Sequence, residues 1–247
     1  MVHYLSVDDR RDVLTIVVGV IPARLHSKRF PNKILTLIND KPMVMHVYDR
    51  AKEADKLDDV IIAIDSNETE EALKSYKPNI QMTDSEHLSG TDRVAEVIKD
   101  IDADVILNIQ GDEPMLDPVI VNQLIDAFED ALVEMATIAS TVIDNIDYVN
   151  PNSVKVMIDE NGFASAFRRQ TKDIEIGGYY HHVGMYGYRK ETLLQFTKLD
   201  QTENEAKFNL EQLRALDNGI PIKVVLTDYP YRGIDTEEDL NQFESNQ

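Results

Sequence analysis

A group of basic side chains interrupts a strongly acidic sequence. The 247 residues include 45 Asp and Glu against 25 Lys and Arg, a net charge of −20, yet residues 24–41 contain only one acid, Asp40. The basic residues of this segment are Arg24, Lys28, Arg29, Lys33 and Lys41. Long cationic side chains on an exposed loop can surround phosphates and offset charge on a leaving pyrophosphate. The segment predicts a site for a small anionic ligand; the alternative is a solvated loop whose charges neighbouring residues balance.

The loop that holds these cations matches neither of the two common phosphate-binding motifs. It lacks the Gly-Lys-Ser/Thr of a Walker loop and the Gly-x-Gly-x-x-Gly of dinucleotide-binding folds. It follows directly on the apolar run 14–21, so cations and backbone N–H groups converge where a strand ends. We therefore predict a triphosphate-binding loop of another type over residues 21–33.

Two acidic motifs could supply the ligands of a metal ion. Asp112 lies in Gln-Gly-Asp-Glu-Pro at residues 110–114, and Asp235 lies in Gly-Ile-Asp-Thr at residues 233–236. Two carboxylates from distant strands that converge on substrate phosphates form a typical Mg²⁺ site. A structural role is the alternative for each, since Asp112 could form a turn and Asp235 could cap the last helix.

Alternating apolar and helical segments predict the framework that positions these residues. Continuous apolar, β-branched runs indicate strands buried on both faces, as in a parallel sheet. These runs cover residues 14–21, 60–64, 105–109 and 136–142, and helical patterns cover residues 43–54, 67–75 and 91–101. Such β-α-β units place the loops after the strands on one edge of the sheet, where ligands bind. The predicted fold class is α/β with a mostly parallel, Rossmann-like sheet.

The second half of the sequence predicts a smaller, β-rich part. The expected elements are a hairpin of residues 154–158 and 163–167 on an Asn-Gly turn, strands over 182–188 and 222–226, and helices over 205–217 and 236–243. No Pro/Gly/Ser-rich linker divides the sequence, so we predict a single domain over residues 1–247. Within it we expect a loose extension at residues 1–12 and a smaller β-rich insertion over about residues 145–190.

The composition disfavours several classes of function. A net charge of −20 repels nucleic acid and anionic lipid, so we expect neither as a partner. The sequence has no cysteine, which excludes disulfides and thiolate metal sites and is compatible with a reducing compartment. Because we find no secretory signal and no apolar run of about eighteen residues, we expect a cytoplasmic protein.

Beyond these features, the chain resembles the 3-deoxy-manno-octulosonate cytidylyltransferase (CMP-Kdo synthetase) family. The similarity rests on motifs that occur in order along the chain: Ile-Pro-Ala-Arg at 21–24 with Lys33, Lys-Pro-Met at 41–43, Ser-Gly-Thr-Asp-Arg at 89–93, Gln-Gly-Asp-Glu-Pro at 110–114, Pro-Asn at 151–152 with Val-Lys-Val at 154–156, His-Val-Gly-Met-Tyr-Gly-Tyr-Arg at 182–189, Leu-Glu-Gln-Leu-Arg at 210–214 and Gly-Ile-Asp-Thr at 233–236. The resemblance implies a GT-A-like nucleotidyltransferase, usually a homodimer, that activates a lipopolysaccharide sugar. It also implies that the β-rich insertion over about residues 145–190 serves sugar binding and dimerisation. With Mg²⁺ such an enzyme would transfer CMP from CTP to the anomeric hydroxyl of a 3-deoxy-ulosonic acid and release pyrophosphate.

The resemblance also implies roles for individual residues. The expected catalytic residues are Arg24, Arg29 and Lys33, which would hold the triphosphate, and Asp112 and Asp235, which would hold Mg²⁺. The expected nucleotide-binding residues are Ala23, Arg24, Lys33, Ser89, Gly90 and Thr91, and the expected sugar-binding residues are Gln110, His182, Tyr186, Glu211 and Gln212. Without the family context, His182 would be interpreted as a packed histidine, and Glu211 and Gln212 as an exposed helix face.

The departures from the family fall where sugar specificity should lie. The family's Gly-Lys-Pro-Leu is Asn-Lys-Ile-Leu at residues 32–35, and its Phe-Ser-Arg is Phe-Arg-Arg at residues 167–169. The extra charge of Arg168 leaves an 8-amino-8-deoxy variant of the sugar open as the substrate. A nucleotidyltransferase of the same fold acting on a nonulosonate is a competing hypothesis, and a non-catalytic nucleotide-sensing module is another. The presence of both Asp112 and Asp235 argues against the sensing module.

Overall fold

The computed structural model describes residues 15–26, 30–143, 145–169, 178–230, 233–234 and 238–240. In these residues the main sheet has nine strands, seven of them in the order β11-β7-β10-β6-β1-β4-β5. These seven strands are β1 (Val17–Ala23), β4 (Asp59–Ile64), β5 (Ile80–Met82), β6 (Val105–Asn108), β7 (Met135–Ser140), β10 (Tyr179–Arg189) and β11 (Ile222–Thr227). A hairpin of β8 (Lys155–Ile158) and β9 (Ala164–Arg168) joins the sheet through β10, while β2 (Leu37–Ile38) and β3 (Lys41–Pro42) pair separately.

The strands that lead to the predicted site are parallel and end at one edge of the sheet. β1 pairs in parallel with both β4 and β6, and Ala23 at the end of β1 lies opposite Ile64 at the end of β4. Val20, Ile62 and Leu107, one from each of these strands, are fully buried. Strands covered on both faces are what the continuous apolar runs predict. The expected mostly parallel α/β sheet is confirmed, with strand ends shifted by a few residues.

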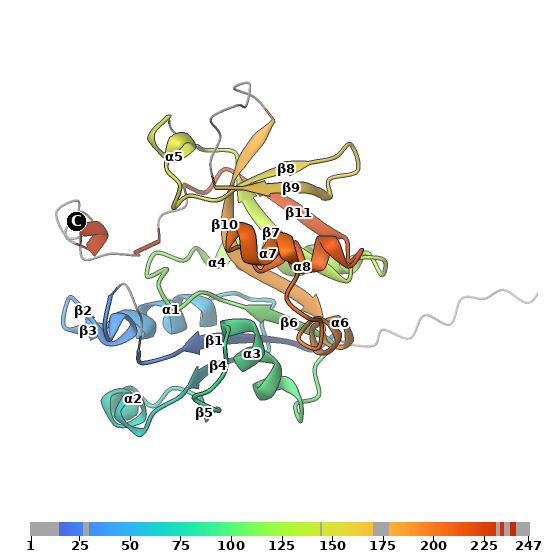
Figure 1. Ribbon diagram of the computed structural model, residues 1–247. Helices are drawn as coiled ribbons and strands as arrows, with labels where there is room; N and C mark the ends of the chain where they lie inside the picture. The colour runs from blue at the N-terminus through green and yellow to red at the C-terminus, as the bar shows by residue number, and fades with distance from the viewer. Residues whose placement is uncertain are drawn as a thin grey trace, which may run out of the picture.

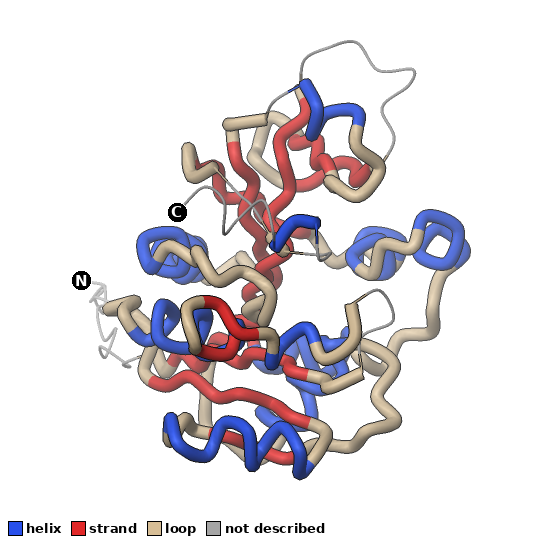
Figure 2. Tube along the Cα trace, turned by 90° about the vertical axis from the view of Figure 1, so that its left-hand side faces the viewer, coloured by secondary structure: helices blue, strands red, loops and turns tan. Residues whose placement is uncertain are grey.

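Helices cover both faces of the sheet, whose strands pass through the middle of the molecule (Figure 2). They are α1 (Met43–Lys52), α2 (Asn67–Leu73), α3 (Gly90–Ile98), α4 (Pro118–Asp126), α5 (Asn145–Val149), α6 (Lys190–Phe196), α7 (Glu203–Phe208) and α8 (Gln212–Asp217), with 3-10 helices η1 (Lys33–Leu35), η2 (Lys74–Tyr76) and η3 (Ala127–Glu129). Val47 of α1 and Leu124 of α4 belong to one apolar core, and Val94 of α3 and Leu193 of α6 to another. All four are fully buried. Burial of each such side chain contributes about 1.5–3 kcal/mol.

β10 connects the parallel strands to the later part of the chain. It is antiparallel to β6 on one side and to β7 on the other, so the segment 145–190 supplies a central strand of the main sheet. The predicted hairpin is present as β8 and β9, and Gly162 occupies its turn in the left-handed region, with φ of 78°. This hairpin lies at the opposite end of the molecule from α2 and β5 (Figure 1).

The single helix predicted over residues 205–217 is wrong, because the chain forms two helices there. α7 begins with a capping box between Thr202 and Glu205 and ends at Asn209. The φ of Asn209 is 52°, a left-handed conformation that asparagine tolerates and that stops a helix. The second helix, α8, follows with Glu211 as its N-cap residue.

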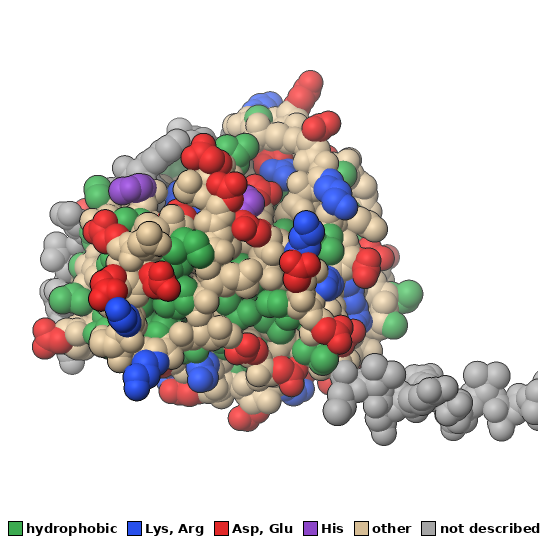
Figure 3. Space-filling model, turned by 90° about the horizontal axis from the view of Figure 1, so that it is seen from below, with side chains coloured by type: hydrophobic (Ala, Val, Ile, Leu, Met, Phe, Trp, Pro, Cys, Tyr) green, Lys and Arg blue, Asp and Glu red, His purple; other side chains and the backbone are tan. Residues whose placement is uncertain are grey.

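Charge is dispersed over the face of the molecule seen in Figure 3. In Figure 3, acidic side chains are scattered over one face of the molecule, with basic and apolar side chains between them. Across the described ranges, no helix is both long enough and apolar enough to cross a membrane. The extension predicted at residues 1–12 and most of the helix predicted over 236–243 lie outside the described residues.

Candidate active site

A cavity of about 260 Å³ lies where the parallel strands end. Its wall comes from the loop after β1, the loop after β6, and the start of α3 with the residues that precede it. The lining residues are Pro22, Arg24, Lys33, Ile34, His87, Leu88, Ser89, Gly90, Arg93, Gln110, Gly111 and Asp112. The fold thus brings the cationic loop and the first acidic motif to one place.

Lys33 and Asp112 form an ion pair at the wall of this cavity. Nζ of Lys33 lies 2.5 Å from Oδ2 of Asp112. The sequence suggested a cation on an exposed loop, but the Lys33 side chain is only 9% exposed, because η1 packs it beside the buried Ile34. The Asp112 side chain is 28% exposed. The Asp112 carboxylate thus fixes the position of the nearly buried ammonium group at the cavity wall.

Asp65 connects the cationic loop to α3. It follows β4, where its Oδ1 accepts from the N–H of Leu25 at 2.9 Å and its Oδ2 accepts from Nη2 of Arg93 at 3.2 Å. Arg93 is 3% exposed and also donates to the hydroxyl of Thr83. Sequence reasoning missed Asp65, whose only signal is its place directly after a predicted strand.

The start of α3 forms a further part of the wall. Ser89 is the N-cap residue, and its hydroxyl accepts from the N–H of Asp92 at 3.1 Å in a capping box. Gly90 approaches Pro22 so closely that an added Cβ would lie 3.2 Å from the proline Cγ. Thr91, expected beside the nucleotide, is 2% exposed, and its hydroxyl donates to Glu211 at 2.6 Å.

A bulge in β10 brings expected sugar-binding residues together. Between Val183 and Tyr186 the register against β7 shifts, so that His182 and Tyr186 face β7 positions only two residues apart. Their ring centroids are consequently 5.4 Å apart. In the bulge, the carbonyl of Gly184 accepts from Nε2 of Gln110 at 3.2 Å. Bulges often redirect side chains beside active sites, and this one orients three expected sugar ligands.

His182 is a buried, neutral imidazole. It is 6% exposed, and burial lowers its pKa to about 3. Its Nε2 lies 3.1 Å from Oγ1 of Thr137, whose single proton is donated to the carbonyl of Met185 at 2.8 Å. The threonine oxygen must then accept from His182. This places the imidazole proton on Nε2 and leaves Nδ1 as an acceptor.

Glu211 lies beside the start of α3. Its Oε2 accepts from Thr91, and Nη2 of Arg214 is 4.0 Å from its Oε1. Burial raises the pKa of the Glu211 carboxyl, and the hydrogen bond from Thr91 opposes that rise. In the described part of the chain, Oε1 of Glu211 and the hydroxyl of Tyr186 have no hydrogen-bond partner. Buried polar atoms of this kind are candidates for contact with a ligand.

Two further expected site residues are buried, and two unexpected residues support their neighbours. Ala23 is fully buried and Gln212 is 7% exposed, so the alternative interpretation of an exposed helix face does not hold for Gln212. Sequence reasoning missed Asn108, which donates to Thr91 at 3.4 Å, and Thr137, which contacts His182. The signal for both was a polar residue inside an apolar strand.

The expected metal site is described only in part. Asp235 and Arg29 lie outside the described residues, but the N–H of Ile234 donates to the carbonyl of Asp112 at 3.0 Å. No cluster of three or more potential metal-binding side chains occurs among the residues that the structure describes. Mg²⁺ usually binds one or two carboxylates together with phosphate oxygens and water. Asp112 at the cavity wall fits that pattern.

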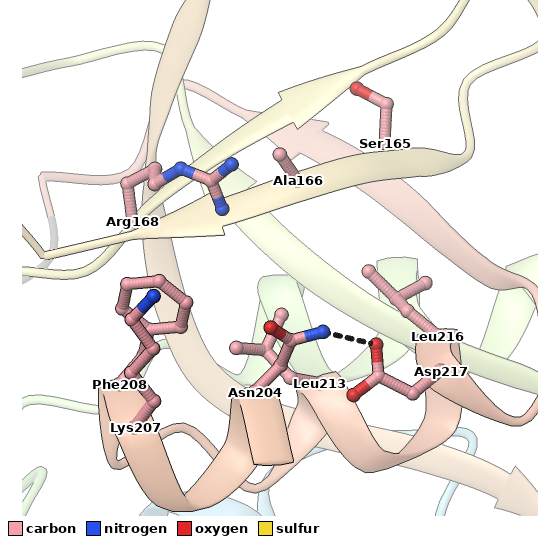
Figure 4. Close-up of a pocket in the computed structure, with 9 residues that line it drawn as sticks. All are labelled: Ser165, Ala166, Arg168, Asn204, Lys207, Phe208, Leu213, Leu216 and Asp217. Atoms are coloured by element: carbon pink, nitrogen blue, oxygen red, sulfur yellow. Dashed lines mark hydrogen bonds between the residues drawn. The ribbon is translucent and has the colours of Figure 1, made fainter. Parts of the chain in front are cut away.

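A second cavity, of about 340 Å³, lies between β9 and the helices α7 and α8 (Figure 4). Arg168 is in its wall, with its guanidinium group 5.8 Å from the ring centroid of Phe208. Across the cavity from Arg168, Nδ2 of Asn204 donates to Asp217 at 2.9 Å. Arg168, at which the sequence departs from the family, therefore lines this second cavity and not the first.

Known proteins match the chain over nearly its whole length. Residues 18–224 match the family model described as cytidylyltransferase. A 3-deoxy-manno-octulosonate cytidylyltransferase from Thermodesulfovibrio yellowstonii is 39% identical over 243 residues, covering 91% of this chain and 95% of the relative. One from Solibacter usitatus is 42% identical over 235 residues, covering 92% of each chain.

Solved structures agree with the sequence matches. A CMP:2-keto-3-deoxy-manno-octonic acid synthetase in complex with CTP has a TM-score of 0.87 at 34% identity, covering 94% of this chain and 98% of that one. A 4-diphosphocytidyl-2C-methyl-D-erythritol synthase from Anaerococcus prevotii has a TM-score of 0.62 at 14% identity, covering 94% and 98%, and shares the fold. This chain therefore belongs to the cytidylyltransferases and, among them, to the 3-deoxy-manno-octulosonate cytidylyltransferase family.

Proposed function

We propose that this protein transfers CMP from CTP to the anomeric hydroxyl of 3-deoxy-manno-octulosonic acid and releases pyrophosphate. The contact between Lys33 and Asp112 carries the proposal, because it joins the cationic loop and the first acidic motif at one cavity. The substrate assignment comes from relatives named for this reaction that match over 91% and 92% of the chain. Neither a silent module nor a nonulosonate enzyme is favoured by these matches.

The cavity residues would act by positioning and by electrostatic stabilisation. In the reaction, the anomeric oxygen bonds to the α-phosphorus while the bond from that phosphorus to the pyrophosphate oxygen breaks. Arg24 and Lys33 would bind the phosphates and stabilise the charge that moves onto the leaving pyrophosphate. Gln110 and Tyr186 would hold the sugar acid so that its hydroxyl attacks in line.

Pyrophosphate release tests the proposal directly. The protein is incubated with CTP, Mg²⁺ and a panel of 3-deoxy-manno-octulosonic acid, its 8-amino-8-deoxy form and a nonulosonic acid. We expect release with CTP and the first sugar acid, and much less with ATP, GTP or UTP. Comparable turnover of ATP or GTP would exclude the cytidine assignment, and turnover with the nonulosonic acid alone would exclude the sugar assignment.

We also propose that Asp112 and Asp235 bind Mg²⁺. When bound, the ion would neutralise phosphate charge and polarise the α-phosphate. The proposal is supported by Asp112 at the cavity wall and by the hydrogen bond from Ile234, the residue before Asp235, to the Asp112 carbonyl.

Asp235→Asn separates metal binding from helix capping. Asparagine caps a helix about as well as aspartate, so the melting temperature should hold. The lost charge should weaken Mg²⁺ binding, measured by calorimetry with CTP present, and lower turnover; Asp112→Asn should behave likewise. Unchanged Mg²⁺ binding and turnover in Asp235→Asn would assign the residue to capping alone.

The homodimer and the cytoplasmic location are further proposals. The family resemblance supports the dimer, and sedimentation velocity at micromolar concentration tests it. The absence of cysteine is compatible with a reducing compartment. Fractionation of the source cells would test the location.

A further inference from the structure

Thr91 connects the start of α3, at the first cavity, to Glu211 at the start of α8. It lies in the first turn of α3, directly after Ser89 and Gly90, which line the first cavity. The Thr91 side chain instead bonds to a distant part of the chain, since its Oγ1 lies 2.6 Å from Oε2 of Glu211, 120 residues away in sequence. A hydroxyl–carboxylate bond of this length is a strong, charge-assisted hydrogen bond.

The contacts around Thr91 give this hydrogen bond a direction. A threonine hydroxyl has one proton and two lone pairs. Nδ2 of Asn108, which can only donate, lies 3.4 Å from the same oxygen. The oxygen of Thr91 therefore accepts from Asn108 and directs its proton to Glu211, and both steps favour the ionised carboxylate.

Thr91 is also better placed than the neighbouring cation to orient Glu211. Arg214 binds Glu205 through two bonds of 2.8 and 2.5 Å and approaches Glu211 only at 4.0 Å. Thr91 and Ser89 use two of about four acceptor positions of the carboxylate, and its buried Oε1 has no hydrogen-bond partner among the described residues. Acceptor capacity therefore remains for a ligand that carries hydroxyl groups.

We propose that the Thr91 hydroxyl, supported by the Asn108 amide, holds the Glu211 carboxylate in position to accept hydrogen bonds from the sugar acid. Thr91 is thus a positioning residue for the sugar acid and not a nucleotide ligand through its side chain. The inference rests on the proposed function, which supplies the sugar acid. Within residues 89–91, Ser89 and Gly90 line the cavity, while the side chains of Thr91 and Ser89 bond to Glu211.

The charges around Glu211 add a pH-dependent readout. The groups that face it are Asp92 from α3, Arg214 from its own helix, and Tyr186 and Tyr188 from β10. Burial raises the Glu211 pKa and the Thr91 hydrogen bond lowers it, so loss of that bond raises the pKa further. A carboxylate accepts fully only above its pKa. Without the Thr91 hydroxyl, the fall in sugar affinity on acidification should therefore begin at a higher pH.

Thr91→Val tests the proposal, because valine keeps the shape and removes the hydroxyl. We expect the KM for 3-deoxy-manno-octulosonic acid to rise about ten-fold, equivalent to about 1.4 kcal/mol, while the KM for CTP stays within about two-fold. Thr91→Ser, which retains the hydroxyl, is the matched control and should restore most of the sugar affinity. The pH profile of the sugar KM should shift upward in Thr91→Val and not in Thr91→Ser.

Two results would contradict this role of Thr91. A rise in the KM for CTP alone, or no change in either KM, would overturn the inference and leave the proposed function standing. If the wild-type protein releases no pyrophosphate with any sugar acid, the proposed function fails and takes the inference with it. If Thr91→Val does not fold, Thr91→Ala takes its place. It is compared with Thr91→Ser by the ratio of the KM for the sugar acid to the KM for CTP.

Discussion

At the residue scale, the Lys33–Asp112 pair places two groups of opposite charge at the wall of the first cavity. In the described structure each group neutralises the other at 2.5 Å. The Lys33 side chain is 9% exposed and the Asp112 side chain is 28% exposed. Because both charges lose water on folding, desolvation offsets much of their attraction, and the net contribution of the pair to folding stability is small. The pair is therefore better explained by binding than by stability.

Lys33→Met separates these roles. Methionine keeps the buried aliphatic volume and removes the charge, so the turnover number for pyrophosphate release should fall about 100-fold or more, while the melting temperature changes by only a few degrees. Lys56→Met is the matched control, because Lys56 pairs with Asp126 on the exposed surface. A wild-type turnover number in Lys33→Met would remove this residue from the mechanism, and a large loss of melting temperature would assign it to the fold.

At the element scale, β10 positions the expected sugar-binding residues His182 and Tyr186. It lies between β6 and β7, and its backbone must approach both closely. At Gly187 an added Cβ would lie 2.6 Å from Cε2 of Phe128 and 3.0 Å from Cδ2 of Leu107. Only glycine allows η3, which carries Phe128, to pack on this face of the strand without displacement.

Gly187→Ala should lower the free energy of unfolding by about 1–3 kcal/mol, because the added methyl group overpacks a filled core. Urea unfolding measures the change. Phe128→Leu removes the ring atoms that the added methyl group would meet. Gly187→Ala should therefore lower the free energy of unfolding less in a Phe128→Leu background than in the wild type. An effect of Gly187→Ala below about 0.5 kcal/mol would mean that the ring moves aside freely.

Elements that a local residue pattern marks could be predicted from the sequence. Features that depend on pairing with distant residues could not. The apolar runs of β1 and β6 identify buried strands, and the crossover rule then places their loops at one edge. The position of β10 within the main sheet and its bulge depend on partners far along the chain, which periodicity does not reveal. The break at Asn209 was missed because its neighbours continue a helical pattern and only its backbone conformation departs from it.

The same distinction applies to the candidate site. Lys33 and Asp112 could be singled out because each belongs to a larger pattern after a predicted strand, the group of cations at residues 24–41 and the Gln-Gly-Asp-Glu-Pro motif at residues 110–114. Asp65 and Asn108 could not, because a single polar residue at a strand end is common and its partner cannot be known before the fold. The side-chain direction of Thr91 depends on α8, whose separate existence the sequence did not predict.

At the scale of the whole molecule, the buried neutral His182 makes stability depend on pH. Its pKa of about 3 in the folded state lies below the usual 6.5, with burial as the main cause. As the pH falls from about 6.5 toward 3, the unfolded state takes up a proton that the folded state refuses, so stability decreases over this window.

His182→Gln should therefore lose less stability than the wild type between pH 7 and pH 4.5, because glutamine does not titrate. Thermal melting or urea unfolding at a series of pH values measures this difference. His26→Gln, at an exposed position, should keep the wild-type dependence. Equal losses in His182→Gln and the wild type would show that other groups dominate the acid response.

The loop after β6 is held from both directions along the chain. Lys33 reaches Asp112 from 79 residues before it, Gln110 bonds to Gly184 74 residues later, and the Asp112 carbonyl accepts from Ile234 near the end of the sequence. Because synthesis proceeds from the N-terminus, β1, β6 and their loops can pair while the chain is still being made. The last of these contacts has to wait until residue 234 has left the ribosome. Chains that stop before residue 234 would therefore lack this contact, although they contain β1, β6 and the loops that line the first cavity.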